Sequence, residues 1–581
     1  MHMKNIENLE HKRHTLAHLM ARAVLEFYPD SKPTIGPAIE NGFYYDFDFS
    51  SPIKEEDLPK IEEKMKELLS SWTGFTHKEV TADEARAHFA GNQYKTELIN
   101  ELEEKGETIT LYTAGDFTDL CRGGHSENPN RDIDTRAFRL SHLAGAYWRG
   151  DEKNKMLTRI YGLAFDTKKE LLDHDAMIEE AKKRDHRKLG KELDLFTFSD
   201  LVGPGLPLWT PKGTLLTDLI MGKIESIQKN YGYQKVRIPH ITKPELYKTS
   251  GHWDKFGDEL FKVTGKAGAD FILKPMNCPH HTQIYASSPR SYKDLPIRYM
   301  ELGVVYRDEQ AGELLGLSRV RSITMDDGHL FCRPDQIEVE IKNIVSVIRE
   351  FYNSLDMLGD DNYWVSLSVR DPEAKDKYLG DDEVWEISEK ALEKIAIEEK
   401  LNYKKMEGEA AFYGPKLDFM FKDALGRERQ LATAQLDFNM PKRFELEYTD
   451  SDGSKKTPVM IHRAIAGSME RFISVMIEHF AGAFPYWLSP VQVKILPISD
   501  AHQEYAKTIL NGLLEKGVRA ELDTNNETLG KKIRNWNLEK VPYAFVVGDK
   551  EVEDEKITVE SRDSGKLGVK TIEEFIEYTN N

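Results

Sequence analysis

The side chains best suited to metal chemistry are one cysteine and two histidines that lie far apart along the chain. Cys278 stands in KPMNCPHH, His329 in TMDDGHLF and His462 in VMIHRAIAGSMERF. The intervals of 51 and 133 residues match no zinc-finger spacing, so spacing alone does not predict a metal site. On residue types alone, a buried structural cysteine and two unrelated histidines are the commoner arrangement.

A second set of similar side chains lies in the first quarter of the sequence. His14 and His18 are four residues apart in HTLAHLMARAVLEF, which would place them on one face of a helix. Cys121 and His125 repeat that interval in DLCRGGH, whose glycines favour a loop. Such pairs are more often core or surface residues, and a four-residue metal site is the sharper alternative.

Two arginines occupy positions that suit an anionic ligand. Arg307 ends the strand-like run IRYMELGVVYRDE beside Asp308 and Glu309, where carboxylates could hold its guanidinium or form a surface ion pair with it. The loop QAGELLGLSRV then leads to a second run, RSITMDDGHLF. Arg471 lies in the first turns of a helix after IHRAIAGS, where the helix dipole also favours negative charge.

The elements that would position these side chains can be located from periodicity. Residues 212–230 predict a helix with one broad apolar stripe, followed by a strand in YQKVRIPHI, which could be core or a dimer seam. A basic run at 182–191 predicts an exposed linker helix within 181–197, and LVGPGLPLW starts a new domain. Alternating strand and helix signals after Pro490 predict a small α/β domain. The predicted domains are 1–180, 198–486 and 490–581.

Composition restricts the classes of protein that remain. Among 581 residues, 40% are hydrophobic and 31% charged, which is typical of a soluble globular protein. We expect neither a membrane helix nor a secretory signal, because no apolar run is long enough and the first 14 residues are polar. A net charge of −19 argues against DNA as a partner but leaves room for a local basic patch. Three cysteines favour a reducing cytoplasm.

The order of these pieces resembles the three motifs of class II aminoacyl-tRNA synthetases. The runs KPMNCP, MDDGH, VMIHRAI, GEAAFYGPKLDF and AQLDF are similar to those of bacterial-type threonyl-tRNA synthetases, and the likeness extends from about His14 to the C-terminal domain. It implies a multidomain α+β and α/β fold. A class II antiparallel-sheet catalytic core would be flanked by an N-terminal α+β editing domain and a C-terminal α/β anticodon-binding domain.

The resemblance also implies roles for individual residues of the catalytic domain. Arg307 would grip the α-phosphate and Arg471 the γ-phosphate of ATP bound with Mg²⁺, while Glu309 and Gln430 orient the nucleotide and Lys416 approaches it. Cys278, His329 and His462 would hold one Zn²⁺ with a position left open for the substrate. Further residues would line the threonine pocket, with Asp327 accepting the hydroxyl proton: Met276, Asp327, Tyr413 and Gln435. The products would be threonyl-adenylate and then threonyl-tRNA(Thr), made by a homodimer.

An editing site and an anticodon site follow from the same resemblance. The runs HTLAH, NGFYYDF, QYK and DLCRGGH imply hydrolysis of seryl-tRNA(Thr) by His14, His18, Cys121 and His125 beside Tyr45, Lys95 and Asp119. Whether this group also holds a metal is open in the sequence, and we expect no stable one. Asn526 and Glu551 match positions that read anticodon bases, and the basic linker would contact the tRNA backbone. The likeness opens on the editing segment, without the ubiquitin-like β-grasp domain that many relatives carry first.

Several positions depart from the family pattern. His280 and Met325 replace a usual glycine and glutamine, Leu315 replaces the histidine of LHGL, and Gly124 and Glu560 are milder departures. We therefore expect the chemistry to survive with altered kinetics. One alternative is another synthetase of this class, seryl or prolyl, against which the cysteine and two histidines argue. Another is a non-charging RNA-binding paralogue, which Met325 and Leu315 favour but the intact arginines do not.

Overall fold

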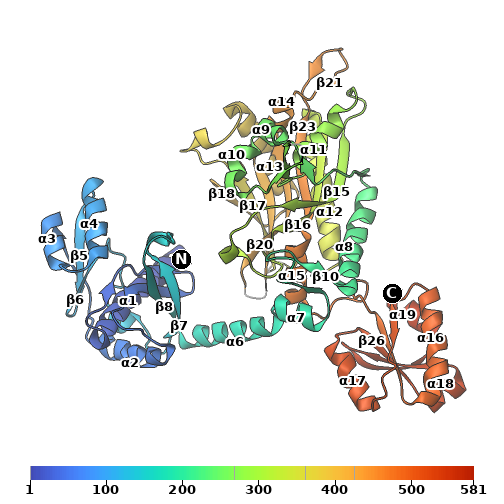
Figure 1. Ribbon diagram of the computed structural model, residues 1–581, viewed down its shortest axis with the longest axis horizontal. Helices are drawn as coiled ribbons and strands as arrows, with labels where there is room; N and C mark the ends of the chain where they lie inside the picture. The colour runs from blue at the N-terminus through green and yellow to red at the C-terminus, as the bar shows by residue number, and fades with distance from the viewer. Residues whose placement is uncertain (1, 267, 360–361, 424–425, 581) are drawn as a thin grey trace. The chain divides into compact units, whose positions relative to one another are not determined.

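The chain folds as two units joined through a long helix (Figure 1). This computed structural model describes residues 2–266, 268–359, 362–423 and 426–580. The units are residues 1–179 and 180–581, and the division falls inside helix α6 (Lys168–Arg184). Among the described helices, none is both long and apolar enough to cross a membrane.

The N-terminal unit is built on two antiparallel sheets. In the larger sheet the strand order is β1-β3-β8-β7, with β2 paired to β3, and the smaller sheet has the order β4-β5-β6. The strands are β1 (Lys32–Pro33), β2 (Ala38–Ile39), β3 (Gly42–Asp48), β4 (Thr76–Val80), β5 (Ile109–Ala114), β6 (Phe117–Leu120), β7 (Phe138–Tyr147) and β8 (Met156–Ala164). The main helices are α1 (His2–Phe27), α2 (Leu58–Leu69), α3 (Ala82–His88) and α4 (Gln93–Glu104).

Helix α1 is the central helix of this unit. Its apolar side chains pack with Phe43, Tyr45 and Phe47, which alternate along β3 and are fully buried. Because side chains four apart share a helix face, the burial of α1 also fixes the direction of the histidines it carries.

The connection to the second unit differs from the predicted exposed helix. Helix α6 ends at Arg184, and Asp185 begins a separate helix, α7 (His186–Glu192), by accepting a hydrogen bond from the Arg187 backbone N–H. His186, Leu189 and Gly190 of α7 are buried. The basic run therefore has one solvent-facing side and one packed side, because a helix lying on a domain must bury a stripe.

An eight-stranded sheet forms the middle of the second unit. Its order is β11-β15-β16-β23-β20-β19-β17-β18, antiparallel except for the two outermost pairs. The strands are β11 (Gln234–Lys235), β15 (Ile297–Tyr306), β16 (Ser322–Cys332), β17 (Tyr363–Val369), β18 (Tyr403–Glu407), β19 (Lys416–Lys422), β20 (Glu428–Asp437) and β23 (Val459–Ser468). Helices of this part are α8 (Pro211–Lys229), α12 (Ile337–Asn353), α13 (Asp382–Glu398) and α15 (Met469–His479).

The two faces of this sheet have different roles. On β16, Leu330 and Cys332 point into the large apolar core that the helices cover, whereas Asp327 and His329 line a cavity. Because side chains alternate along a β-strand, one face of β16 contributes to the apolar core and the other face lines the cavity. The same holds for β20, where Ala434 belongs to the core and its neighbour Gln435 lines the cavity.

Among its described residues, the second unit also carries one three-stranded sheet and two two-stranded sheets, apart from the C-terminal sheet described below. The three-stranded sheet has the order β12-β14-β13, made of β12 (Ile241–Thr242), β13 (Lys262–Thr264) and β14 (Asp270–Leu273), near helices α9 (Pro244–Ser250), α10 (His252–Phe256) and α11 (Cys278–Ala286). The two-stranded sheets form between β9 (Phe196–Thr197) and β10 (Leu208–Trp209), and between β21 (Tyr448–Thr449) and β22 (Lys455–Lys456). Helix α11 is important because its first residue is Cys278.

The C-terminal segment forms a separate five-stranded α/β layer. The strand order is β25-β24-β26-β27-β28, with β24 parallel to both its neighbours. The elements are β24 (Val493–Pro497), α16 (Gln503–Glu515), β25 (Ala520–Leu522), α17 (Leu529–Leu538), β26 (Tyr543–Val547), α18 (Asp549–Asp554), β27 (Ile557–Ser561), β28 (Gly565–Lys570) and α19 (Ile572–Asn580). The predicted α/β character of this segment is confirmed.

The helix predicted at 212–230 is confirmed by α8, but the strand predicted for YQKVRIPHI is mostly wrong. Only β11 and β12, of two residues each, form there. Beyond β11, the Ile238 backbone N–H donates to the Glu301 carboxylate at 3.0 Å instead of to a neighbouring strand. Pro239 has no N–H to donate, so the ladder stops.

Candidate functional site

Cys278, His329 and His462 converge although they come from three separate elements. Their ligand atoms all lie within 4.8 Å of one another, and all three side chains are buried. His329 on β16 and His462 on β23 are direct cross-strand partners, with ring centroids 4.9 Å apart. Cys278 reaches them from the start of α11. The register of β16 against β23 therefore brings the two histidines together, although their spacing in the sequence did not indicate a metal site.

Each histidine of this triad is held by a partner on its outer side. The Nδ1 of His329 lies 2.7 Å from the Nδ1 of His281, whose Nε2 lies 3.2 Å from the Glu301 carboxylate. The Nε2 of His462 lies 2.9 Å from the Asp437 carboxylate. One ring nitrogen of each histidine is therefore fixed by an outer contact, and the other nitrogen remains for a ligand.

Burial disfavours the charged forms of two members of the triad, Cys278 and His329. It raises the pKa of the Cys278 thiol well above its usual value and lowers the pKa of His329 well below its usual value. A neutral imidazole is the form that binds a metal, while the thiol must lose its proton to do so. This donor set of one sulfur and two nitrogens fits Zn²⁺.

His329 and His462 of the triad line a cavity of about 280 Å³, and Cys278 lies behind them, outside its lining. Asp327 lies beside the triad and accepts a hydrogen bond of 2.7 Å from the Asn277 side-chain amide. Burial raises the pKa of Asp327, and the Asn277 contact opposes that rise. The other residues predicted for an amino-acid pocket, Met276, Tyr413 and Gln435, line the same cavity.

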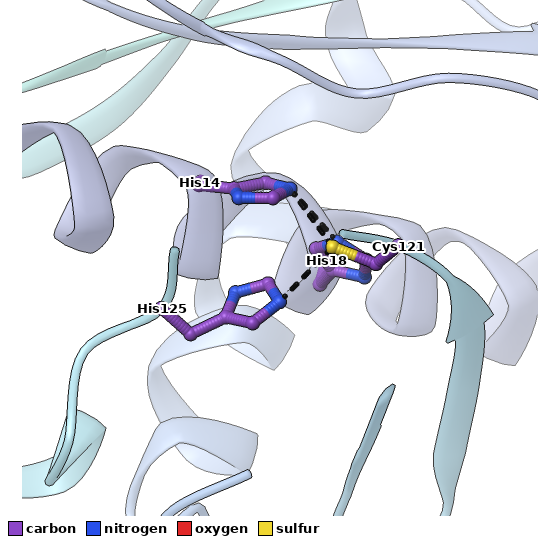
Figure 2. A group of neighbouring side chains, drawn as sticks. All are labelled: His14, His18, Cys121 and His125. Carbon is purple, nitrogen blue, oxygen red and sulfur yellow. Dashed lines mark hydrogen bonds between the residues drawn. The ribbon is translucent and has the colours of Figure 1, made fainter. Parts of the chain in front are cut away.

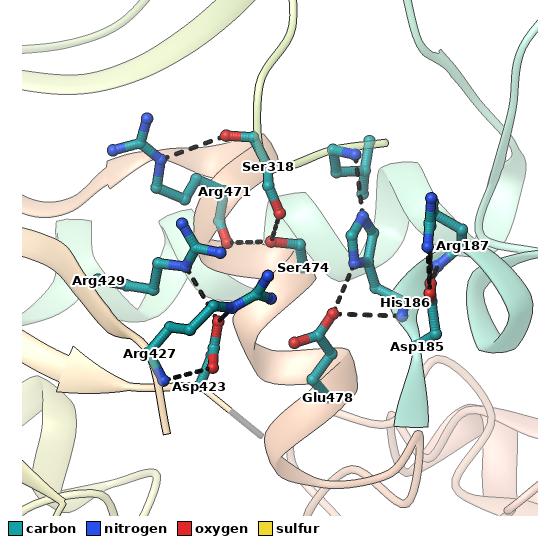
Figure 3. A network of polar contacts seen from close by, with 11 residues as sticks. Asp185, His186, Arg187, Ser318, Asp423, Arg427, Arg429, Arg471, Ser474 and Glu478 are labelled. Carbon is teal, nitrogen blue, oxygen red and sulfur yellow. Dashed lines mark hydrogen bonds and ion pairs between the residues drawn. The ribbon is translucent and has the colours of Figure 1, made fainter. Parts of the chain in front are cut away.

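Arginines line the other part of the cavity. Arg307 follows β15 directly, and its Nε is buried without a hydrogen-bond partner. Arg471 stands in the first turn of α15, and its Nε donates to the Ser318 carbonyl at 3.4 Å (Figure 3). Burial lowers the pKa of Arg471, and the nearby guanidinium groups of Arg429, Arg307 and Arg319 lower it further. Cations that repel one another around an open space favour a polyanionic ligand.

The remaining residues predicted for nucleotide binding have protein partners. The Glu309 carboxylate accepts a hydrogen bond of 2.7 Å from Arg319, and both residues line the cavity. Gln430 also lines it and donates to Asp418 at 2.8 Å. Lys416 pairs with Asp418 as well, but it is absent from the residues that line the cavity. Its predicted approach to the nucleotide stays a prediction.

The N-terminal set of cysteine and histidines also converges (Figure 2). His14 and His18 point from α1 toward Cys121 and His125, which follow β6 in an irregular segment. Hydrogen-bond distances run through the group: 3.2 Å between the Nε2 atoms of His14 and His18, 3.5 Å from Cys121 Sγ to His14, and 3.3 Å from Cys121 Sγ to His125. These contacts link the four side chains to one another, although the Nδ1 atoms of His18 and His125 are buried without a hydrogen-bond partner.

A buried charged network lies next to this group. The Asp119 carboxylate pairs with the Lys95 ammonium and accepts a hydrogen bond from the Tyr45 hydroxyl, and all three side chains are buried. The network and the group, apart from His125, line one cavity of about 350 Å³. A buried ion pair is costly unless it is hydrogen-bonded, and the Tyr45 hydroxyl supplies one such hydrogen bond to Asp119.

Burial sets the protonation states in this N-terminal cavity. It raises the pKa of Cys121 to about 11 and lowers the pKa of His125 to about 2, with the other histidines lowering the latter further. The pKa of His14 is also lowered by burial, and that of His18 is lowered well below its usual value. At neutral pH the group is therefore a thiol and three neutral imidazoles, which can orient a water molecule by hydrogen bonds.

The two residues predicted to read anticodon bases differ in their surroundings. Asn526 is exposed in the loop between β25 and α17. The Glu551 carboxylate accepts hydrogen bonds from the Gly548 backbone N–H at 2.9 Å and from the Thr558 hydroxyl at 2.6 Å. Glu551 thus caps α18, which gives it a local structural role beside any contact with a base.

Sequence reasoning missed the outer partners of the metal-binding triad. His281, Glu301 and Asp437 hold the two histidines, and Asn277 holds Asp327. His281 and Asn277 flank Cys278 in the run MNCPHH, which was a visible signal. His252 is a further neighbour, because its Nε2 lies 3.9 Å from Cys278 Sγ. No pattern in the sequence points from residue 252 to residue 278.

Three stretches of the chain match described protein families. Residues 261–480 match the tRNA synthetase class II core domain (G, H, P, S and T), and residues 492–581 match an anticodon binding domain. Residues 109–161, which include Cys121 and His125, match the threonyl and alanyl tRNA synthetase second additional domain.

Curated proteins named threonine–tRNA ligase align with nearly the whole chain. The protein from Cytophaga hutchinsonii is 50% identical over 570 residues, which are 97% of this chain and 87% of that protein. The protein from Bacteroides fragilis is 51% identical over 572 residues, 98% of this chain and 87% of that protein. The protein from Gloeobacter violaceus is 50% identical over 581 residues, 98% of this chain and 92% of that protein.

Solved structures give the same grouping. A crystal structure of the RNA binding domain of threonyl-tRNA synthetase from Cryptosporidium parvum has a TM-score of 0.64 and 37% identity, covering 68% of this chain and 98% of that chain. Prolyl-tRNA synthetase from Giardia lamblia, in complex with prolyl-adenylate, has a TM-score of 0.55 and 17% identity, covering 70% of this chain and 80% of that chain. The second likeness shows the fold alone.

Proposed function

The chain belongs to the threonyl-tRNA synthetase family, and from this premise we propose which of its residues carry out activation, selection and editing. As a threonine–tRNA ligase it uses ATP to join threonine to tRNA, which sets aside the seryl, prolyl and non-charging alternatives. The observation that carries the proposal is that Arg307 and Arg471 line one cavity with His329 and His462, the two histidines that converge with Cys278.

Activation takes place at the arginine end of the cavity. A threonine carboxylate attacks the α-phosphate of ATP, so negative charge increases on that phosphate and on the departing pyrophosphate. Arg307 faces the α-phosphate and Arg471 the γ-phosphate, and Mg²⁺ accompanies the nucleotide. The unpaired Nε of Arg307 supports this, because a buried donor without a partner is costly until a ligand supplies an acceptor. Fixed cations stabilise the transition state more than the ground state.

Amino-acid selection takes place at the triad end. Cys278, His329 and His462 would hold Zn²⁺, which would supply a Lewis acid for the amino and hydroxyl groups of threonine. Valine has the shape of threonine but lacks the hydroxyl, and a site that requires a polar group rejects a substrate without it strongly. Asp327 accepts the hydroxyl proton in a hydrogen bond, and Met276, Tyr413 and Gln435 enclose the side chain.

Serine needs a second site, because it keeps both groups and lacks only a methyl. One such difference gives roughly 10- to 200-fold selectivity. The N-terminal cavity provides the hydrolytic site: His14 and His18, with His125 packed against them, orient a water molecule at the ester of seryl-tRNA(Thr), and Cys121 donates as a neutral thiol. The buried Lys95–Asp119 pair fixes the floor of this cavity.

The rest of the chain binds tRNA and forms a dimer. We assign editing to residues 1–180, the linker to 181–197, catalysis to 198–486 and anticodon binding to 490–581, with Asn526 and Glu551 contacting bases. A homodimer is supported by exposed apolar side chains just before α8: Phe198, Leu201, Val202 and Leu208. The absence of long apolar helices among the described residues is compatible with the cytoplasm as the site of action.

One assay tests the proposal. Purified enzyme is charged with threonine or serine on tRNA(Thr), before and after dialysis against a chelator. Loss of threonine charging on chelation, and its return with Zn²⁺, is the expected result. Full threonine-dependent pyrophosphate exchange in protein shown to be free of zinc would overturn the selection mechanism.

A further inference from the structure

A buried histidine of helix α7 contacts the loop that borders the part of the cavity where ATP is proposed to bind (Figure 3). His186 is the first residue of α7 and is 3% exposed. Its Nδ1 lies 2.7 Å from the Glu478 carboxylate of α15. Its Nε2 accepts a hydrogen bond of 3.1 Å from the backbone N–H of Leu317, in the loop of residues 307–321. The ring therefore bridges α15 and this loop.

The two contacts determine which ring nitrogen of His186 carries the proton. A backbone N–H can only donate, so the Nε2 that faces Leu317 is the acceptor. The proton then sits on Nδ1 and is donated to Glu478. His186 is a neutral imidazole with both nitrogens used, which is the arrangement of a fixed side chain rather than of a mobile one.

The loop is shaped to reach this ring. Gly316 has a φ of +50°, and a Cβ at that position would lie 2.4 Å from His186 Nε2. Neither that conformation nor that distance suits a larger residue. The loop thus approaches His186 more closely than any side chain at position 316 would allow.

The next residue along the chain, Ser318, connects Leu317 to the proposed ATP site. The carbonyl of Ser318 accepts from Arg471 Nε, and the Ser318 hydroxyl lies 3.1 Å from the hydroxyl of Ser474 on α15. Ser318 and Arg471 both line the cavity. Because the Leu317 backbone is held by His186, the adjacent Ser318 carbonyl is fixed in the position where it accepts from the Arg471 guanidinium.

We propose that His186 is a positioning residue for ATP, which holds the 307–321 loop through Leu317 and thereby aims Arg471. This inference rests on the proposed placement of ATP beside Arg471. His186 touches no substrate. It stands on the connector directly after α6, so the segment that joins the two units also secures the nucleotide loop.

Two amide substitutions separate this role from a merely structural one. In His186→Gln the side-chain carbonyl extends to the former Nε2 position and can accept from Leu317, whereas in His186→Asn the shorter amide reaches only Glu478. Both variants are polar and neutral, so they share the loss of the ring. The exposed Glu192→Gln, on the same helix, is the control for disturbance of α7.

The readout is threonine-dependent pyrophosphate exchange by the full chain, without tRNA. We expect His186→Asn to raise the KM for ATP roughly tenfold, the effect of one lost hydrogen bond with a stranded buried donor. The KM for threonine should change less than about twofold, because the triad end lies outside this contact. His186→Gln should remain within about threefold of the wild type for both substrates, and Glu192→Gln should match the wild type.

Equal ATP effects in His186→Asn and His186→Gln, or equal rises in both KM values, would overturn the proposal. If both amide variants lower only the melting temperature and leave the KM for ATP unchanged, His186 is structural and the proposal is likewise wrong. Arg471→Ala, measured in parallel, separates the two hypotheses. An unchanged KM for ATP in that variant would show that the nucleotide lies elsewhere, whereas a raised KM beside a normal His186→Asn would refute only the role of His186.

Discussion

The two cysteine–histidine groups share residue types and distances but differ in what surrounds them. In both groups the ligand atoms lie within 4.8 Å of one another. In the N-terminal group, His14, His18, Cys121 and His125 take one another as hydrogen-bond partners. In the triad of the second unit, the histidines take outer partners and turn their remaining nitrogens toward the cysteine and the cavity.

The difference teaches that proximity does not by itself identify a metal site. The N-terminal side chains hydrogen-bond to one another where a cation would lie, whereas the triad, held from outside, presents donors that are costly to bury without one. The triad is also fully buried, while three of the four N-terminal residues are partly exposed. We therefore expect zinc at the triad and water in the N-terminal cavity.

The strongest way to break this comparison is to remove one member from each group. His329→Ala should abolish both zinc binding and threonine activation, because two remaining donors cannot keep the ion. His125→Ala should leave the zinc content of the chain unchanged. Metal analysis of the purified variants, with pyrophosphate exchange on the same samples, makes the measurement. A drop in zinc in His125→Ala would mean that the two groups are alike.

Asp437→Asn tests the outer partner of His462 without touching a donor. The amide cannot reproduce the charge that orients the imidazole, and losses of outer partners typically cost ~10–100-fold in metal affinity. Zinc release to a competing chelator should accelerate accordingly, and threonine charging should become dependent on added zinc. An unchanged rate of release would show that the sheet register alone fixes His462.

Cys121 tests whether the N-terminal group uses a neutral thiol. Because the pKa of Cys121 is raised to about 11, the thiol keeps its proton at neutral pH and can act as a donor but not as a thiolate. Cys121→Ser should retain most deacylation of seryl-tRNA, whereas Cys121→Ala should slow it by about tenfold or more. Threonine charging should persist in both variants. A serine variant as slow as the alanine variant would indicate thiolate chemistry instead.

The elements that carry both groups were predictable from periodicity, but their convergence was not. The interval between His14 and His18 correctly indicates one helix face, since a helix is a local structure. The pairing of His329 with His462 depends on the register of β16 against β23, which forms only when the whole sheet assembles. Only the family resemblance anticipated that Cys278 joins them.

The connector shows a second limit of sequence reasoning. Six basic residues between 182 and 191 indicate a solvated helix, and the helical part of that prediction is confirmed. The pattern gives no sign that His186 is buried, because its partners Leu317 and Glu478 are more than a hundred residues away in sequence. Contacts of that kind come from tertiary packing, which charge patterns do not encode.

The smallest expected effect is the loss of stability of the N-terminal unit at low pH, which tests whether its histidines are neutral and free of metal. Burial lowers the pKa of His125 from 6.5 to about 2 and also lowers the pKa values of His14 and His18. Below pH 6.5 the unfolded chain therefore binds protons that the folded N-terminal unit does not. The stability that His125 contributes is complete above pH 6.5 and is lost as the pH drops toward about 2, by about 1.4 kcal/mol per pH unit. His14 and His18 act in the same direction.

Hydrogen exchange of peptides from residues 1–179, at pH 7.5 and 5.5, measures this loss for the N-terminal unit alone. His125→Gln should reduce the loss between the two pH values by about 1 kcal/mol, because glutamine does not titrate. A chelator should have no effect on that unit at either pH, because we expect no cation in the N-terminal group for it to remove. If chelation lowers its protection at pH 7.5, a cation occupies the N-terminal group and outer partners are not what separates the two sites.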